Sequence, residues 1–232
     1  MKPRQLFLFV EGEGDKRAAP ILLKRLLKER KAQDVLVVSP DPWMVGEFPA
    51  LRGRVNDFSV WKRFLELGLR KYGMEACLLL IDGDSPPSGG ETFCVKRAAQ
   101  QLAAIAKERG AGDRFSASIV IANLEFESWL IAGASSLAGK TLPNGGGSFS
   151  RDLKLPTGDI ELAPRDAKGF FNRALSCGYR PALHQASITE LVDLNTIRQQ
   201  NMRSFRRLEN ALDEMIDAFR GNRHVVSPIA NS

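Results

Sequence analysis

The sequence has little cysteine and histidine, and this scarcity argues against several kinds of metal site. The three cysteines, Cys77, Cys94 and Cys177, are far apart, and no Cys-x-x-Cys pair occurs. The only histidines are His184 and His224. A structural zinc site needs about four Cys or His ligands at characteristic spacings, so the sequence does not favour one. Cys77 lies inside an apolar run and is predicted to be a small buried residue.

Long apolar runs are also missing. None approaches the roughly 20 residues that a membrane-spanning helix needs. The N-terminus, MKPRQLFLFV, has only a short apolar stretch, and acidic residues follow it at once, unlike a secretory signal. These absences predict a cytoplasmic protein with no membrane partner. The 232 residues suffice for one large domain or a domain with an appendage.

Basic residues are in modest excess, with 33 Lys and Arg against 27 Asp and Glu. The resulting net charge of +6 fits a polyanionic partner but does not establish one. Acidic residues gather after apolar runs, whereas basic residues spread along helical stretches such as KRLLKERK and RSFRRLENALDEM. A metal-dependent enzyme that acts on phosphates needs a basic surface around an acidic pocket. Solvated helix faces explain the same basic stretches equally well.

Apolar runs alternate with amphipathic stretches in the first 139 residues. The predicted strands are 5–10, 34–39, 76–84 and 116–125, and the predicted helices are 15–31, 56–72 and 91–109. Residues 41–54 are expected to form a loop. This alternation predicts an α/β, Rossmann-like fold with a mainly parallel four-stranded sheet flanked by helices. In such sheets ligands bind at the carboxyl ends of the strands.

Beyond Gly139 the composition changes. Residues 139–159 are rich in Gly, Pro and Ser and are predicted to be a loop. Helices are predicted at 164–176, 188–192 and 202–219, and residues 225–232 are expected to be a frayed tail. We therefore divide the chain into a core, residues 1–139, and a mainly helical part, residues 140–232, that completes the cleft.

One segment, ASSLAGKT at 134–141, has the pattern of a nucleotide-binding loop but not its context. Such a loop follows a strand and precedes a helix. Here the helix-like FESWLIAG comes before it, and Pro143 and a glycine run at 145–147 come after it. We therefore predict that Lys140 does not bind a nucleotide.

Acidic side chains follow three of the four predicted strands. They are Glu11, Asp15, Asp82, Asp84, Glu125 and Glu127. In LIDGD the two aspartates project from the same face of an extended backbone, and Gly83 lets the chain approach a phosphate or metal. Gathered at one edge these carboxylates repel one another without cations, and such hard oxygen ligands select Mg²⁺ or Mn²⁺. Any of them could instead cap the following helix, Asp15 most readily.

VEGEGD followed by LIDGD resembles the Toprim pattern, in which a strand-end glutamate and a later Asp-x-Asp hold metal. Toprim domains occur in topoisomerases, bacterial primases, small RNA-maturation nucleases and the OLD (overcoming lysogenization defect) nucleases. The fuller set, with NLEFESWLIAG, PRDAKGFF, HQ and SFRRLENAL, is similar to a family of small standalone Toprim-like proteins of unknown function. That resemblance spans nearly the whole chain and implies a Toprim-like core.

The resemblance implies roles for the first acids. Glu11 corresponds to the Toprim glutamate, and Asp82 and Asp84 correspond to the Asp-x-Asp. OLD-type nucleases carry a further acid one helical turn after the glutamate. Asp15 matches that position, as Asp in place of the more usual Glu.

It also implies roles for residues later in the chain. Glu125 or Glu127 would complete a second metal site, and we prefer Glu125 because it lies nearer the strand end. Lys168 resembles the lysine that OLD-type enzymes place near the scissile phosphate, although an exposed helix lysine fits its sequence equally well.

Two features of the C-terminal part are candidates for substrate contacts. Arg203 and Arg207 lie one helical turn apart, a spacing suited to binding phosphates. Arg206, next to Arg207, is a third candidate for the same contact. A basic amphipathic helix that packs through its apolar face is the competing interpretation, and we weight it slightly higher. His184 could contact substrate, but a structural histidine is the favoured reading.

Together these residues predict a Mg²⁺- or Mn²⁺-dependent phosphodiesterase with two ions, an endonuclease acting on DNA more readily than RNA. Its catalytic residues would be Glu11, Asp82, Asp84 and Lys168. Tyr72 and Tyr179 are the only tyrosines, and there is no large gate domain, so a covalent topoisomerase is disfavoured.

OLD-type nucleases carry an ATPase in the same chain, so the resemblance suggests a separate ATPase partner here, in a bacterial anti-phage defence module. The alternatives are a non-catalytic Toprim-like regulator that binds nucleic acid or a partner, and a phosphotransfer enzyme acting on small nucleotides.

Overall fold

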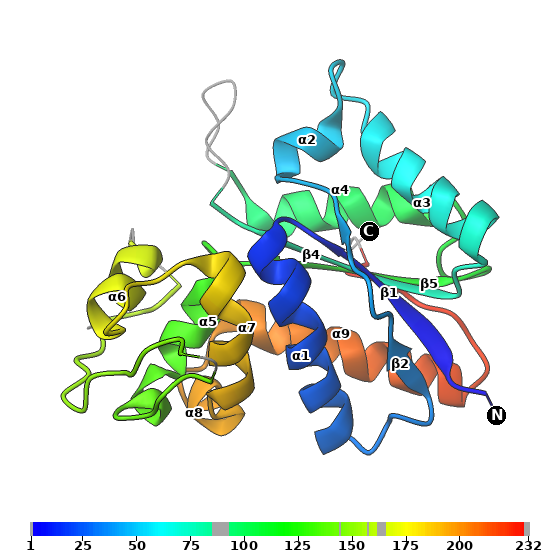
Figure 1. Ribbon diagram of the computed structural model, residues 1–232. Helices are drawn as coiled ribbons and strands as arrows, with labels where there is room; N and C mark the ends of the chain where they lie inside the picture. Colours follow the sequence, from blue (N-terminus) through cyan, green and yellow to red (C-terminus); the bar gives the residue numbers. More distant parts are fainter. Residues whose placement is uncertain (1, 85–92, 144, 157, 162–165, 230–232) are drawn as a thin grey trace.

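A parallel β-sheet with helices on both faces forms the centre of the molecule (Figure 1). The computed structural model describes residues 2–84, 93–143, 145–156, 158–161 and 166–229. The strand order is β2-β1-β4-β5-β6, and β3 also pairs with β1. In the described part of the chain every strand pairing is parallel. The strands are β1 (Arg4–Val10), β2 (Leu36–Val38), β3 (Trp43–Met44), β4 (Ala76–Asp82), β5 (Ser116–Ala122) and β6 (Val226–Ser227).

The helices fall into two layers. The first, α2, α3 and α4, covers one face of the sheet, and α1 and α9 cover the other, with α5, α7 and α8 beside them (Figure 1). The helices are α1 (Glu13–Glu29), α2 (Phe48–Arg52), α3 (Ser59–Tyr72), α4 (Val95–Glu108), α5 (Phe126–Ala132), α6 (Ala167–Ala174), α7 (Pro181–Leu191), α8 (Leu194–Gln199) and α9 (Arg203–Arg220), with a 3-10 turn at Ala134–Leu137.

The central strands are apolar throughout because both of their faces are buried. Along β1, Leu6 and Leu8 pack into the core beneath α1 and α9, whereas Phe7 and Phe9 pack into the core beneath α3 and α4. Successive side chains of a strand point to opposite faces, so one run of apolar residues serves both layers. The continuous apolar pattern of residues 5–10 thus correctly predicted a strand inside the sheet.

The predicted α/β fold with a mainly parallel sheet is confirmed, but four strands was too few. Residues 41–54, expected to be a loop, contain β3 and α2. The expected frayed tail contains β6, in which Val226 pairs with Ala117 of β5. Elements of two to five residues are too short to show a hydrophobic period. Pairing to a long neighbouring strand stabilises β3 and β6 instead, and α2 packs against α3.

Among the helices, two C-terminal predictions need correction. Helix α7 begins at Pro181, well before the predicted start at residue 188, and α8 was not predicted at all. The pattern of α7 is weak because small and polar residues occupy much of its buried face, as at Gln185 and Thr189. The ends of the predicted helices at 91–92 and 164–165, and the loop at 85–90, lie outside the described residues.

The part after residue 139 packs directly on the core. Helix α7 lies along α1, α9 packs against β5, and β6 extends the sheet beyond β5 (Figure 1). Among the described residues, no helix combines the length and the apolar character needed to cross a bilayer. The division at residue 139 stays a prediction.

Candidate functional site

The carboxyl ends of β1, β4 and β5 lie at one edge of the sheet, and hydrogen bonds join them. Glu11 directly follows β1, and its Oε2 accepts a hydrogen bond from the backbone N–H of Asp82 at 3.0 Å. Asp82 ends β4, and its Oδ1 accepts from the backbone N–H of Phe126 at 2.8 Å. Each strand-end carboxylate is therefore fixed by the backbone of the next segment along this edge.

Asp15 lies in the first turn of α1, and both of its oxygens are occupied. Its Oδ2 accepts from the backbone N–H of Gly12 at 3.3 Å, which confirms the alternative that Asp15 caps the helix. Its Oδ1 accepts from Nε2 of Gln185, on α7, at 2.8 Å. Asp15 is only 8% exposed, so this neutral amide replaces water beside a buried carboxylate. Asp15 is thus both a cap and a member of the acidic edge. By this name we mean the six acids at the strand ends: Glu11, Asp15, Asp82, Asp84, Glu125 and Glu127.

Glu125 and Glu127 flank the start of α5 but face different surroundings. Glu125 occupies the cap position before the helix, whereas Glu127, 3% exposed, accepts a hydrogen bond from the Tyr179 hydroxyl at 3.0 Å. Repulsion from Glu127 contributes to the raised pKa of both Asp15 and Asp82, after the larger effect of burial. Glu127 is therefore within electrostatic reach of Asp15 and Asp82, and both glutamates also feel Asp84, so the preference for Glu125 stays a prediction.

Burial and mutual repulsion raise the pKa values at this edge. Burial raises the pKa of Glu11 to about 7, and repulsion from Asp84 and Asp15 adds to it, against the hydrogen bond from the Asp82 N–H. Burial likewise raises the pKa of Asp15 to about 6. Asp82 has its pKa well above the usual range because it is buried and faces Asp15, Glu11 and Glu127. The site favours either protons or another cation among these oxygens.

The pKa values of Glu125 and Glu127 are raised as well, and the charge of a lysine opposes this effect. Burial raises the pKa of Glu125 to about 7, and Glu127 and Asp84 add repulsion. The positive charge of Lys168, on α6, works in the opposite direction at Glu125 and also at Asp15 and Glu127. Lys168 therefore lies within electrostatic reach of these acids, and its contact with a substrate phosphate stays a prediction. Asp84 and Lys168 are both exposed.

The carboxylate oxygens of these acids are ligands that suit a hard divalent cation, but as placed the side chains do not converge on one point. Within the described ranges, no three Asp, Glu, His or Cys side chains form a group that could hold a metal ion as placed. The carboxylates accept hydrogen bonds from backbone N–H groups, from Gln185 and from Tyr179. Oxygen-only donors that repel one another are the set that Mg²⁺ and Mn²⁺ prefer. Coordination by three of these acids would require them to converge further than they do as placed.

The three arginines predicted to bind nucleic acid have different environments. Arg203 and Arg206 are exposed in the first turn of α9. Arg207 instead pairs with Glu214 at 3.0 Å and also donates to Ser227, so it links α9 to β6. The pair one helical turn apart is therefore not available as predicted, because one member is engaged in an internal ion pair.

The structure also tests the two weaker candidates. His184 is buried, and its Nδ1 accepts from the backbone N–H of Arg180 at 3.0 Å, as expected for a structural histidine. Lys140 donates to the backbone oxygen of Leu191 at 3.1 Å, and a 3-10 turn precedes it where a nucleotide-binding loop has a strand. Both arrangements support the structural interpretation.

Three buried residues of this region were missed by the sequence. Gln185 and Tyr179 hold Asp15 and Glu127, and Glu161 accepts from the backbone N–H groups of Arg203 and Ser204 at 2.6 and 2.7 Å. The Glu161 backbone oxygen also accepts from Asn123, just after β5, at 2.7 Å. Residue types such as Gln and Tyr carry no charge pattern, so spacing alone could not have indicated them.

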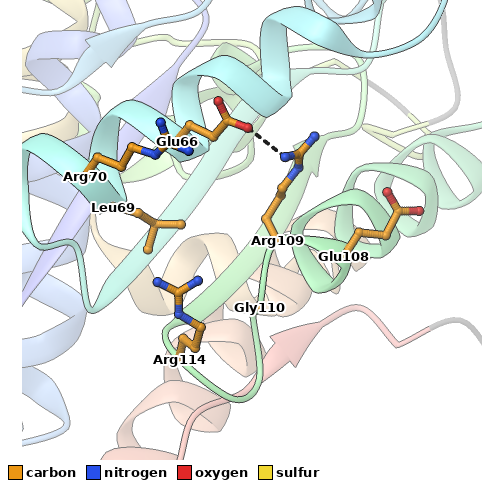
Figure 2. Close-up of a pocket in the computed structure, with 7 residues that line it drawn as sticks. All are labelled: Glu66, Leu69, Arg70, Glu108, Arg109, Gly110 and Arg114. Carbon is orange, nitrogen blue, oxygen red and sulfur yellow. Dashed lines mark hydrogen bonds and ion pairs between the residues drawn. The ribbon is translucent and has the colours of Figure 1, made fainter.

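A separate hollow of about 360 Å³ lies between α3, α4 and the turn before β5 (Figure 2). Its Arg109 pairs with Glu66 at 2.7 Å, which joins the end of α4 to the middle of α3. Arg114 lies just before the first residue of β5, so this hollow is at the opposite end of that strand from the acids. It contains none of the predicted site residues.

Comparisons with known proteins place the chain in a family. No curated protein matches it in sequence. Among solved structures, the C-terminal region of the Burkholderia pseudomallei OLD protein is similar over 93% of this chain and 100% of that chain. The TM-score is 0.48 and the sequence identity is 11%, too distant to assign an activity. A family described as "Domain of unknown function (DUF4276)" matches residues 10–213. The chain therefore belongs to the DUF4276 family.

Proposed function

We propose that this protein is a divalent-metal-dependent nuclease that cleaves phosphodiesters of DNA, or of RNA. The observation that carries the proposal is the electrostatically coupled acidic edge, which extends over three strand ends and the first turns of α1 and α5. Buried carboxylates that repel one another are costly to keep unless a cation compensates them. A cluster of this kind beside an exposed lysine is suited to binding metal and phosphate together.

In this proposal Glu11, Asp82 and Asp84 hold one ion, and Asp15 and Glu127 hold a second, with Glu125 beside them. Two divalent ions, when bound, would polarise the phosphate and supply a hydroxide nucleophile near neutral pH. Lys168 would offset negative charge that develops on the phosphate. Asp84 and Lys168 are exposed, so they can meet a substrate that the buried acids cannot reach.

The arginines at the start of α9 would extend the contact to the substrate backbone. Arg203 and Arg206 are exposed at the helix end that Glu161 holds near β5. Guanidinium groups bind phosphates through paired hydrogen bonds. We leave Arg207 out of this role because it pairs with Glu214. By the resemblance to OLD nucleases, we also propose a separate ATPase partner in an anti-phage defence module. Co-purification with an ATPase encoded beside it would test this.

The direct test is cleavage of plasmid DNA and of RNA in Mg²⁺ or Mn²⁺ by the wild type and by Asp82→Asn. Asparagine keeps an oxygen for the Phe126 N–H and removes the charge. We expect Asp82→Asn to lower the rate at least about 100-fold, because metal-held charge is worth several kcal/mol in the transition state and each 1.4 kcal/mol is tenfold.

The matched control is Asp113→Asn, which changes an exposed aspartate in the turn before β5. It should cleave at the wild-type rate. Equal cleavage by Asp82→Asn, or no cleavage of either nucleic acid by the wild type, would contradict the proposal.

A further inference from the structure

We propose that Tyr179 and Gln185 are positioning residues of this site, which orient Glu127 and Asp15 for a divalent ion. The inference rests on the proposed function and deepens it, because it gives the C-terminal part of the chain a role in the site. Both residues contact the site through a carboxylate rather than through substrate.

Gln185 reaches Asp15 because α7 and α1 pack unusually closely. Gln185 is 1% exposed, and its Nε2 lies 2.8 Å from Oδ1 of Asp15. A Cβ at position 14 would lie 1.9 Å from Oε1 of Gln185, so only glycine leaves room for this amide. The backbone N–H of Gly12 donates to the other oxygen, Oδ2. Hydrogen bonds to both oxygens therefore fix the plane of the Asp15 carboxylate.

Tyr179 holds Glu127 in a comparable way. Its ring packs against Phe171 and His184, with centroids 5.1 and 6.1 Å apart, and only 8% of the residue is exposed. This packing directs the hydroxyl to Oε1 of Glu127 at 3.0 Å. The ring therefore determines where the donor lies, and the donor determines the orientation of the carboxylate.

The chemical nature of the two donors distinguishes positioning from neutralisation. An amide and a hydroxyl orient a carboxylate without cancelling its charge, whereas an Arg or Lys at the same place would compete with a metal ion. Carboxylates that ligate metals are themselves hydrogen-bonded by such outer partners, which commonly contribute tenfold or more to metal affinity. The simpler alternative is that these bonds only satisfy buried oxygens.

The test is a pair of double-mutant cycles read out as Mn²⁺ affinity by isothermal titration calorimetry. Tyr179→Phe removes only the hydroxyl, and Gln185→Met keeps the volume of the side chain. We expect each to weaken Mn²⁺ binding about tenfold. In the Glu127→Gln background Tyr179→Phe should have no further effect, and in the Asp15→Asn background Gln185→Met should have none.

Two variants serve as matched controls and should keep wild-type affinity. Tyr72→Phe changes the other tyrosine, and Gln101→Met changes an exposed glutamine of α4. Thermal melts of every variant separate lost affinity from lost folding.

The outcomes separate this inference from the nuclease proposal. The positioning role would be overturned if Tyr179→Phe and Gln185→Met kept the wild-type Mn²⁺ affinity. It would also be overturned if each lowered the affinity by the same factor with and without its carboxylate partner. Neither result would count against nuclease activity. Coupled losses of affinity in a protein that cleaves neither DNA nor RNA would support the positioning role and overturn the nuclease. A wild type that binds no Mn²⁺ would overturn both.

Discussion

At the scale of single residues, the acidic edge stores unfavourable electrostatic energy that only protons or cations relieve. Glu11 and Glu125 each have a pKa of about 7 against an ordinary value of 4.5. The cause is mainly burial, with repulsion from other acids of the cluster added. In the unfolded chain these side chains are hydrated and apart, so this cost belongs to the folded state.

This difference predicts how stability changes with pH. In EDTA we expect the free energy of unfolding to fall as the pH rises from about 5 to about 7.5. Across that window the folded state binds more protons than the unfolded state, because its carboxyl pKa values are the higher ones, and stability therefore decreases with pH. Urea titrations at pH 5, 6, 7 and 8 measure the slope.

The change Glu11→Gln should flatten that slope, because glutamine does not titrate. Glu108→Gln, an exposed residue at the end of α4, is the control and should keep the wild-type slope. A free energy of unfolding that stays level or rises over this window in the wild type would refute the prediction.

At the scale of elements, the packing of α7 on α1 depends on a single glycine. Gly14 lies within α1, where alanine is ordinarily the better helix former. Here an added Cβ would also meet Cβ of Pro181 at 3.0 Å, besides the Gln185 amide. The second glycine of GEGD therefore exists for helix packing, not for a turn.

We expect Gly14→Ala to destabilise the protein by about 1–3 kcal/mol, the usual cost of overpacking a buried contact. Gly12→Ala is the matched control, since nothing lies within 4 Å of a Cβ there and its backbone is extended. Denaturant unfolding of both variants measures the difference. A Gly14→Ala protein as stable as Gly12→Ala would show that α7 can move away freely.

At the scale of the whole molecule, the two ends of the chain lie close to the same core. The guanidinium of Arg4, at the start of β1, lies 4.6 Å from the ring centroid of Phe219, near the end of α9. After α9 the chain returns to the sheet as β6, and the Arg207–Glu214 pair and Ser227 fasten that return. The segment expected to fray is therefore part of the fold.

We expect Val226→Asp to destabilise the protein by about 1–3 kcal/mol, because it places a charge against the core beneath α4 and beside β5. Ile229→Asp changes a residue that is 68% exposed and should alter stability by less than about 0.5 kcal/mol. Thermal melts compare the two. Equal melting temperatures would mean that β6 contributes nothing to stability.

Local pattern was enough to predict the long elements of this fold and the placement of its acids. The runs at 5–10, 76–84 and 116–125 are apolar on both faces, and parallel strands place their following residues at one edge. Glu11, Asp82 and the acids after β5 therefore had to lie near one another. The sequence could not show β3, α8 or β6, which are too short for a hydrophobic period. β3 and β6 depend on pairing with distant strands, and α8 depends on packing against α5 and α9.

What the sequence by itself determined is thus the fold class and the set of acids at the strand ends, since both follow from spacing along the chain. The tertiary structure alone decided which neighbours those acids have. Asp15 meets an amide 170 residues away, Glu127 meets a hydroxyl 52 residues away, and Arg207 pairs with Glu214 instead of remaining free. Such contacts form where α7 and the segment before it pack on α1 and α5, and where α9 packs on β5. This docking depends on three-dimensional packing that no local pattern encodes.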